Sequence, residues 1–442
     1  MGDTNVRNTG LTRRRFIQSS AAAAAGASVL MRSGNFAYAA GSDTMRVGLI
    51  GCGGRGTGAA VNAVEAAEGI EVYAMGDLFE DRLEDSRRRL QEHIGDRLNV
   101  TDERTFTGFD NYRHVIDSDV DYVILATPPG FRPVQFRYAV DSGKHVFMEK
   151  PTQVDVAGYH SIVEAGTLAD EKGLSVVAGT LYRRQPSFMD AVAEIHGGLI
   201  GEITGAYAYY MTGPIWLRPR LPGMSDMEWQ CRNWYYFTWL SGDHIVEQFV
   251  HNLDIIQWVM QQVPERAIGM GGRLARVDPS YGHIYDHFSV EYAFSGDVRV
   301  EAKCRQFEGA TGRVTNRIVG TKGVADLHPD SSIIRSHDGD VLFRRSEKGN
   351  NAYVVEHTDL IAAIREGQPV NETRQIADST MIAVLGRESA YTGQQLTWED
   401  MLTADMDLVP HTLAFGDMPP EPVPAPGRTR LNRSFLVAGA GQ

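Results

Sequence analysis

A glycine-rich turn between a short apolar strand and a helix constrains the fold of this chain more than any other feature. The expected strand covers residues 45–50, and a helical pattern runs to Ala67 after the turn Gly51-Cys52-Gly53-Gly54-Arg55-Gly56. Glycine allows the tight turn and the close approach to a pyrophosphate, and the helix N-terminus offers unpaired N–H groups. The spacing predicts a dinucleotide-binding loop, with cofactor contacts at Gly51, Gly53, Gly54, Arg55 and Gly56.

Strands and helices then alternate as far as residue 178. Apolar strands are expected over residues 70–75, 121–126, 144–148 and 174–178, with helices over about residues 80–92, 133–142 and 156–172. This alternation predicts a doubly wound parallel sheet, that is, a Rossmann domain over residues 45–178.

Asp77 closes the second strand of this domain, 21 residues after Gly56. That spacing is close to the one expected for a carboxylate that binds the cofactor ribose. A carboxylate there repels a 2′-phosphate, so the sequence favours NAD over NADP, although Arg82 lies nearby. The alternative is that Asp77 caps the following helix before Phe79.

The pattern changes after Gly179. Strands are expected over residues 203–211, 267–277, 287–294, 298–305, 313–320 and 332–335, with helices over about residues 186–197, 245–261 and 356–366. Strands with few helices between them predict an antiparallel sheet. We assign residues 179–355 to a substrate-binding and oligomerisation domain. Residues 356–442 are expected to form C-terminal helices and a proline-rich tail that pack back on the core.

Two motifs are expected at the carboxyl edge of the parallel sheet, where ligands bind in such folds. They are Ala126-Thr127-Pro128-Pro129 and Glu149-Lys150-Pro151. A lysine beside a bound nicotinamide can donate a hydrogen bond to a substrate hydroxyl and help to move its proton. The alternative is a solvated lysine at the end of a strand. The predicted cofactor contacts here are Thr127, Pro128, Glu149 and Lys150.

A polar stripe is expected on the helix over residues 245–261. Glu247 and His251 are i, i+4 neighbours, His251 and Asp254 are i, i+3 neighbours, and His244 extends the stripe. Such a stripe could be an acid/base site, a metal site or a solvated helix face. We predict no metal, because the nucleotide supplies the reactive group. Three cysteines also exclude a four-cysteine zinc site.

Aromatic residues are concentrated in one short segment. Four of the six tryptophans, Trp216, Trp229, Trp234 and Trp239, fall within residues 216–239, with arginines between them. Aromatic faces can stack on sugars, and arginines can bind hydroxyls or acidic groups. The alternatives are a buried insert or a subunit contact. The predicted substrate-binding residues are Arg183, Arg232, Trp234, Trp239 and Asp254.

The charge distribution indicates a removable N-terminal leader. The net charge of -13 combines +4 over residues 1–40 with -17 over the rest, and this acidic balance argues against nucleic acid as the main partner. A twin-arginine pattern, Thr12-Arg13-Arg14-Arg15-Phe16-Ile17-Gln18, precedes a short apolar run and Ala37-Tyr38-Ala39. We expect a signal peptide over residues 1–39, use of the twin-arginine export machinery, a periplasmic or otherwise exported protein, and no transmembrane segment. The alternative is an amphipathic N-terminal helix.

Together these motifs resemble the Gfo/Idh/MocA oxidoreductases, the family of glucose–fructose oxidoreductase and inositol dehydrogenase. The resemblance covers nearly all of the chain after residue 45. It implies an α/β fold with a Rossmann domain and a C-terminal α/β domain on an open, mostly antiparallel sheet. It also implies NAD(P), a sugar or polyol substrate, and a homo-oligomer. By carry-over, Lys150 is the catalytic lysine and His251 the acid/base.

The sequence departs from this family in two places. Glu247 stands where inositol dehydrogenases usually carry aspartate, and Gly130-Phe131-Arg132-Pro133 replaces a stretch in which many members have a histidine. Tyr182-Arg183-Arg184 resembles an element of the NAD-dependent glycosidases of this superfamily, or it simply begins the next helix. The predicted catalytic residues are therefore Lys150, His251, Glu247 and Tyr182.

Three functions remain open at this point. The first is an NAD-dependent oxidoreductase that removes hydride from a sugar ring carbinol and recycles a tightly bound cofactor. The second is an NAD-dependent glycoside hydrolase that oxidises C3, eliminates the aglycone, adds water and returns the hydride. The third is a non-catalytic sugar-binding protein that has kept the fold.

Overall fold

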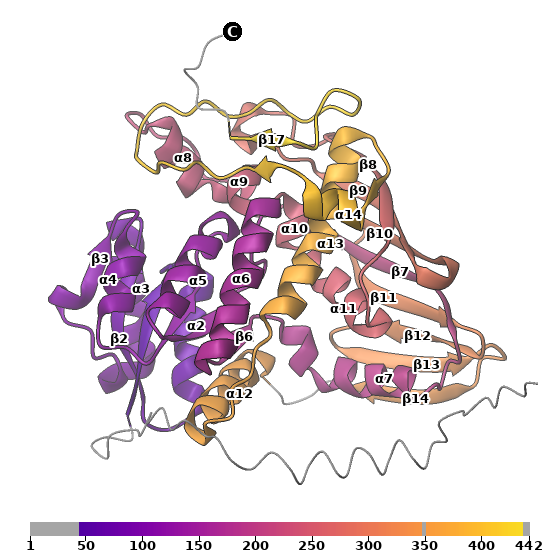
Figure 1. Cartoon of the computed structure of the whole chain (residues 1–442), viewed down its shortest axis with the longest axis horizontal. Coiled ribbons are helices and arrows are strands. Elements are labelled where there is room, and N and C mark those ends of the chain that lie inside the picture. The colour runs from indigo at the N-terminus through magenta and orange to yellow at the C-terminus, as the bar shows by residue number, and fades with distance from the viewer. Residues whose placement is uncertain (1–43, 347–350, 436–442) are drawn as a thin grey trace, which may run out of the picture. The chain divides into compact units, whose positions relative to one another are not determined.

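Six parallel strands form the first sheet of the protein. The computed structural model describes residues 44–346 and 351–435. The strand order is β3-β2-β1-β4-β5-β6 (Figure 1). The strands are β1 (Met45–Ile50), β2 (Ile70–Asp77), β3 (Thr105–Thr107), β4 (Tyr122–Leu125), β5 (His145–Met148) and β6 (Val176–Ala178). This order is that of a Rossmann fold and confirms the predicted doubly wound sheet.

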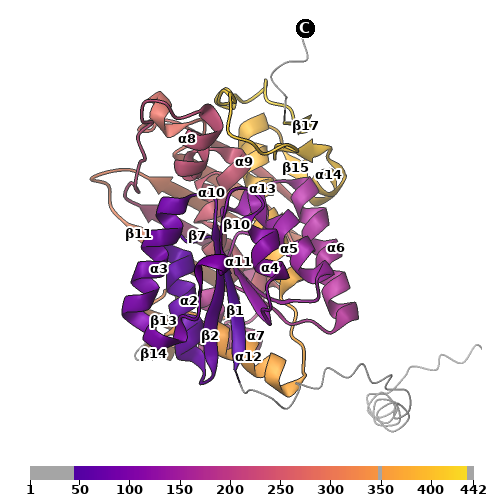
Figure 2. The ribbon, with the colours of Figure 1, turned by 90° about the vertical axis from the view of Figure 1, so that its left-hand side faces the viewer.

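Helices cover both faces of this sheet (Figure 2). On one face lie α2 (Gly54–Ala66) and α3 (Glu80–Ile94), and on the other lie α4 (Asn111–Asp117), α5 (Arg132–Asp141) and α6 (Val156–Lys172). All four residues of β4 are buried. Strands that are covered on both sides need a continuous apolar run, which is why the sequence shows runs rather than alternation here.

The second sheet has nine strands in the order β14-β13-β12-β11-β7-β10-β9-β8-β15. Only β7 and β10 run parallel, and every other neighbouring pair is antiparallel, as predicted. The strands are β7 (Ile203–Thr212), β8 (Arg266–Gly272), β9 (His287–Phe294), β10 (Val298–Gln306), β11 (Arg313–Gly320), β12 (Gly323–Leu327), β13 (Ser331–Ser336), β14 (Val341–Ser346) and β15 (Leu396–Thr397).

One face of the second sheet carries the core of this domain. The helices α7 (Pro186–His196), α11 (Val250–Met260) and α13 (Thr373–Thr392) pack on it. On β10 the inward side chains Val300 and Ala302 are buried, whereas Arg299, Glu301 and Lys303 on the alternate face are partly exposed. This alternation, apolar toward the helices and charged away from them, sets the register of the strand.

The structure differs from the sequence expectation at two element boundaries. The helix expected over residues 245–261 is broken into α10 (His244–Glu247) and α11, with Gln248 and Phe249 between them. The strand expected to reach residue 277 ends at Gly272, because the Asp286 carboxylate accepts backbone hydrogen bonds from Leu274, Ala275 and Arg276. The long helix α13 (Thr373–Thr392) lies in the region where C-terminal helices were predicted without its bounds, and the strands β12 and β14 were not predicted.

The C-terminal part of the chain returns to both domains. The helix α12 (Ala352–Glu366) packs against α2 of the Rossmann domain, and α13 packs against β8 of the second sheet. Residues 404–435, here called the tail, run beside α8 (Asp226–Arg232) (Figure 1). There the Met227 N–H donates to the Gly416 carbonyl over 3.2 Å, and the Tyr285 hydroxyl donates to the Pro424 carbonyl over 2.9 Å.

The predicted signal peptide, residues 1–39, lies outside the described residues, as do residues 347–350 and 436–442. Within the described parts of the chain, no helix combines the length and the apolar character needed to cross a lipid bilayer.

Candidate active site

A cavity of about 1120 Å³ lies between residues that follow β1, β2, β4 and β5 and residues 215–251 of the second domain. It brings together most of the site residues predicted from the sequence. Those that line it are Gly51, Gly53, Gly54, Arg55, Gly56, Asp77, Thr127, Pro128, Glu149, Lys150, Arg232, Trp234, Glu247 and His251.

The glycine loop forms one wall of this cavity. Gly51 has a φ of +96°, and a Cβ on Gly56 would lie 1.8 Å from the Gly51 carbonyl oxygen, so neither position accepts a side chain. A Cβ on Gly53 or Gly54 would meet nothing within 4 Å, because these residues border open space. No side chain caps the N-terminus of α2. This cradle of backbone N–H groups fits the pyrophosphate of a dinucleotide.

Asp77 lies at the end of the cavity beside the glycine loop. One carboxylate oxygen accepts the Cys52 N–H over 2.7 Å, and the other accepts the Phe79 N–H over 2.9 Å. Burial raises the pKa of this carboxyl above its usual value. Asp77 therefore fixes the turn before α3 and also lines the cavity. No side chain caps the N-terminus of α3, so the helix-cap alternative is wrong, and ribose binding by Asp77 stays a prediction.

Lys150 and Glu247 meet at the other end of the cavity. Lys150 Nζ donates to the Glu247 carbonyl oxygen over 2.8 Å and to Glu247 Oε1 over 3.2 Å. Their side chains are only 12% and 8% exposed, so the ion pair is largely removed from water. His251 lies on the same wall, at the start of α11. A primary amine, a carboxylate and an imidazole thus border one space.

Burial tunes the titration of this group. Burial, and then the positive charge of Lys150, lower the pKa of His251 well below its ordinary value, so the ring is neutral at pH 7. Burial raises the pKa of Glu247, while Lys150 and Arg132 oppose that rise. A neutral imidazole next to a charged amine can accept a proton from a hydroxyl to which the amine donates a hydrogen bond.

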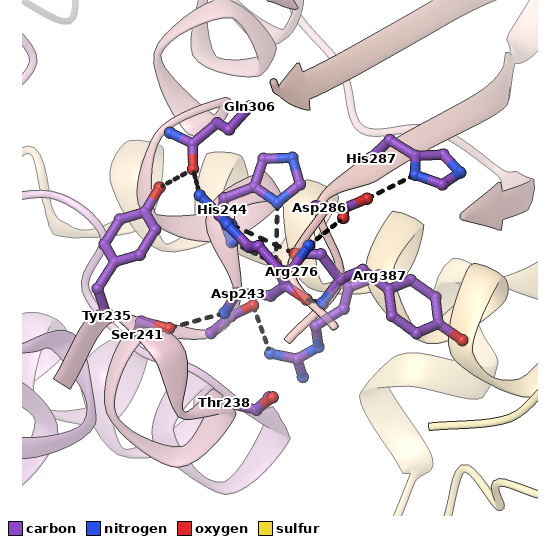
Figure 3. A network of polar contacts seen from close by, with 12 residues as sticks. Tyr235, Thr238, Ser241, Asp243, His244, Arg276, Asp286, His287, Gln306 and Arg387 are labelled. Carbon is purple, nitrogen blue, oxygen red and sulfur yellow. Dashed lines mark hydrogen bonds and ion pairs between the residues drawn. The ribbon is translucent and has the colours of Figure 1, made fainter. Parts of the chain in front are cut away.

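Asp243 places Glu247 by anchoring the start of α10 (Figure 3). Asp243 is fully buried and has a φ of +74°, unusual for a residue with a side chain. Its Oδ1 accepts the His244 N–H over 2.5 Å, and its Oδ2 accepts the Tyr285 N–H over 2.7 Å and the Tyr391 hydroxyl. The His244 ring is also bonded to this carboxylate and points into the network.

The predicted stripe of four polar residues is therefore divided. His244 bonds to Asp243, and Asp254 accepts two hydrogen bonds from Arg183, at 2.8 and 2.9 Å. Only Glu247 and His251 of the four line the cavity. The helix breaks between these two residues, at Gln248 and Phe249.

Four other predicted site residues do not line the cavity. Arg183 and Asp254 neutralise each other, and Trp239 is buried, with its indole N–H donating to Gln230 over 2.8 Å. Tyr182 stacks on Phe188, and its ring centroid lies 5.2 Å from that of His251. Tyr182 thus contacts the predicted acid/base without bordering the open space.

The aromatic segment is divided between the cavity wall and the protein interior. Residues 213–239, here called the cover segment, contribute Trp216 and Trp234 to the cavity wall, whereas Trp229 and Trp239 are buried. Arg232 of this segment pairs with Asp81 of α3 at 3.1 Å and lies over the Phe79 ring at 3.9 Å. The cover segment therefore reaches the Rossmann domain close to Asp77.

Several residues at or beside the cavity were not among the predicted site residues. Arg132, Gln248 and Tyr353 line the cavity, and Phe415 of the tail stacks on Phe79 with ring centroids 5.9 Å apart. These residues lie far apart in the chain, so spacing alone could not bring them to one site. Among the described residues, no group of three or more histidine, cysteine or acidic side chains could hold a metal ion.

Comparisons with known proteins agree with this geometry. Residues 45–180 match the model of an oxidoreductase family with an NAD-binding Rossmann fold, and residues 188–326 match the GFO/IDH/MocA C-terminal domain. The inositol 2-dehydrogenase of Acidothermus cellulolyticus is 25% identical over 298 residues, which are 67% of this chain and 76% of that protein. A glycosyl hydrolase family 109 protein of Streptomyces coelicolor is 28% identical over 169 residues, 38% of this chain and 34% of that protein.

The fold also resembles that of solved structures. A levoglucosan dehydrogenase in complex with NADH and levoglucosan superposes with a TM-score of 0.65 at 17% identity, over 80% of this chain and 99% of that one. With both of its domains matched by family models, the chain belongs to the GFO/IDH/MocA oxidoreductases.

Proposed function

We propose that this enzyme oxidises a secondary alcohol on the ring of a sugar or sugar derivative, with NAD as the hydride acceptor. The observation that carries the proposal is the single cavity that joins the glycine loop to Lys150, Glu247 and His251. The names of related proteins, an inositol dehydrogenase and a levoglucosan dehydrogenase, support a polyol or sugar as substrate.

The side chains supply the proton chemistry of this reaction. Bound NAD supplies the acceptor for the hydride that leaves the carbinol carbon. Lys150 Nζ, held by Glu247, donates a hydrogen bond to the carbinol oxygen. The neutral His251 ring takes the hydroxyl proton, and the carbonyl bond forms as the C–H and O–H bonds break. The products are a keto-sugar, the reduced nucleotide and a protonated histidine.

The preference for NAD over NADP rests on Asp77. A 2′-phosphate at the ribose would meet this carboxylate, which already holds two backbone N–H groups and cannot turn away without losing them. Arg82, with the neighbouring Arg232, is the feature that favours a phosphate. Arg82 donates to the Arg232 carbonyl over 3.2 Å, so one of its donors is already used.

The cofactor is proposed to stay bound and to be recycled in place. The cover segment and Phe415 of the tail contact Phe79 and Asp81 beside the ribose position, so they would have to move before a nucleotide could leave. An enzyme with a retained cofactor needs a second substrate, or a later step of the same reaction, to return the hydride.

An NAD-dependent glycoside hydrolase is the second candidate. The similarity to glycosyl hydrolase family 109 proteins and the contact between Tyr182 and His251 favour it. In this reaction, hydride leaves C3, the C2 proton and the aglycone are eliminated, water adds, and the hydride returns to C3. The net change is hydrolysis, with no nucleotide consumed.

One experiment separates these functions. The purified enzyme is denatured to identify any retained nucleotide by mass spectrometry, and the native enzyme is incubated with myo-inositol, levoglucosan, free aldoses and aryl glycosides. Reduced nucleotide with a keto product selects the dehydrogenase, and aglycone release without net reduction selects the hydrolase. A retained nucleotide with no turnover on the whole panel would favour the non-catalytic sugar-binding protein.

We also propose that the protein is exported and forms a homo-oligomer. The twin-arginine pattern supports export, and the partly exposed alternate face of the nine-stranded sheet offers a subunit interface. Cell fractionation of the Arg13→Lys/Arg14→Lys double variant tests export, because loss of the arginine pair should keep the protein in the cytoplasm. Light scattering of the mature enzyme measures the oligomer.

A further inference from the structure

We propose that Arg132 is a positioning residue of the reaction centre. It clamps the loops that follow β4 and β5, and so holds the backbone beside Lys150 in place for the reaction. The inference rests on the proposed function, because it concerns the groups that hold Lys150. Neither the predicted site nor the family motif includes Arg132.

The clamp is formed by one buried guanidinium. Arg132 is the first residue of α5 and is only 4% exposed, although it lines the cavity. Its Nη2 donates to the Thr127 carbonyl in the loop after β4, and its Nη1 donates to the Pro151 carbonyl in the loop after β5. Because Pro151 directly follows Lys150, these bonds tie the backbone of the lysine to that of the neighbouring loop. The planar fork of arginine suits two carbonyls, whereas the compact ammonium of lysine does not.

The charge of Arg132 is not neutralised by direct contact with a carboxylate. Its two described hydrogen bonds go to neutral carbonyls, and its Nε has no partner among the described residues. Burial lowers the pKa of Arg132 to about 10, and Glu247 and then Glu149 oppose that change. Arg132 also acts on Glu247. Burial raises the pKa of Glu247, and the positive charges of Lys150 and Arg132 partly offset that rise.

The other polar groups near Glu247 do not replace this charge. Glu149 has the opposite effect and raises the pKa of Glu247. The hydroxyls of Tyr210 and Tyr235 donate elsewhere, to Gln248 and Gln306 respectively. The ring of His251 is neutral. Lys150 and then Arg132 are the cations with the largest stabilising effect on the Glu247 carboxylate.

A titration of Glu247 in the holoenzyme tests the charge effect without any substrate. Infrared difference spectra across pH follow protonated carboxyl groups, and the band lost in Glu247→Gln identifies this residue. Arg132→Gln keeps a donor but removes the charge, so the Glu247 midpoint should rise by about one pH unit. Arg132→Lys keeps the charge and should leave the midpoint in place. Arg137→Gln, on the same helix but partly exposed and paired with Asp141, is the matched control.

The rate of nicotinamide reduction by levoglucosan or myo-inositol tests the clamp. Both Arg132 variants should lower kcat about 10- to 100-fold with a smaller change in KM, because neither side chain can bridge the two carbonyls. A purely structural arginine would lower the melting temperature and the rate without moving the Glu247 midpoint, and that result would overturn the proposal.

Two outcomes keep the test decisive. If Arg132→Gln does not fold, Arg132→Lys still tests the clamp, because a wild-type kcat in Arg132→Lys would exclude it. If neither probe reduces the nucleotide in the wild-type enzyme, the proposed function fails for these substrates. The Glu247 titration still supports or excludes the charge effect of Arg132 in that case.

Discussion

His251 is the residue on which the proposed chemistry depends most directly. Its ring borders the cavity, and burial together with Lys150 keeps it neutral and able to accept a proton at pH 7. His251→Ala should therefore lower kcat about 10²- to 10⁴-fold, the usual contribution of a general base, and leave the retained nucleotide in place. Single-turnover reduction of the nicotinamide measures this, with His93→Ala as a control on an exposed histidine. Wild-type turnover in His251→Ala would remove this residue from the mechanism.

His357 should make the fold sensitive to acid without a part in the reaction. It is fully buried, its ring stacks on Phe147 at 4.1 Å, and neither ring nitrogen has a partner among the described residues. Burial lowers its pKa from 6.5 to about 3. At a pH between these two pKa values, the ring of His357 binds a proton in the unfolded chain but not in the folded chain. The free energy of unfolding therefore falls as the pH drops through this range.

Replacing this ring should remove that part of the pH dependence. In His357→Leu, the loss of unfolding free energy between pH 7.5 and pH 5 should be smaller than in the wild type by about 2 kcal/mol. Urea denaturation at both pH values measures the difference, and His93→Leu is the exposed control. An unchanged pH dependence in His357→Leu would mean that the buried ring can take up a proton in the folded protein.

At the scale of elements, the break between α10 and α11 decides where Glu247 lies. Asp243 anchors the start of α10, the helix that ends at Glu247, since its carboxylate accepts from His244, Tyr285 and Tyr391 in a fully buried network. Asp243→Ala would leave these buried donors unpaired and should lower the free energy of unfolding by about 3 to 5 kcal/mol. Chemical denaturation measures this. Asp297→Ala is a matched control, because Asp297 also has a positive φ but is exposed. A cost below 1 kcal/mol at Asp243 would show that water replaces the lost acceptor.

Elements that depend on local patterns could be predicted from the sequence, and those that depend on distant contacts could not. The predicted bounds of α6, β9 and β11 agree with the structure, because alternation or helical periodicity specifies them. The anchoring of α10 by Asp243 was missed because two partners of this carboxylate are 42 and 148 residues away. Nearly every residue of α13 is buried, so this helix has no amphipathic period to recognise.

The same distinction applies to the candidate site. The glycine loop, Lys150 and His251 belong to motifs whose spacing has a chemical reason, and all three line the cavity. Arg183 was predicted to bind substrate from the Tyr182-Arg183-Arg184 element, and Asp254 from the polar stripe. The two residues pair with each other, and a single sequence does not show pairing. Arg132 lies in the stretch that departs from the family pattern, but its role could not be predicted because its contacts come from two separate loops.

At the scale of the whole molecule, both domains line the cavity proposed to hold the nucleotide, and the tail contacts its lining residue Phe79. The Rossmann domain supplies the cradle, and the cover segment and the tail close over Phe79. The contact between Arg232 and Asp81 is the ion pair that joins the cover segment to α3. Because Asp81 is 65% exposed, this pair contributes little to stability, on the order of 1 kcal/mol or less. We therefore expect the loss of this ion pair to change the rate of cofactor release rather than the free energy of unfolding.

Reversing the charge at this contact should open the cover segment. In Asp81→Lys, the new ammonium would face Arg232 and the adjacent Arg82, and we expect nucleotide release to accelerate about 5- to 10-fold, the equivalent of roughly 1 kcal/mol. The loss of bound NADH fluorescence after dilution measures this rate. Glu84→Lys makes the same charge change on the same helix at an exposed position and should release NADH at the wild-type rate. Added salt should accelerate release from the wild type more than from Asp81→Lys, because only the wild type has the attraction to screen. Equal release rates in all three proteins would mean that the nucleotide leaves without displacement of the cover segment.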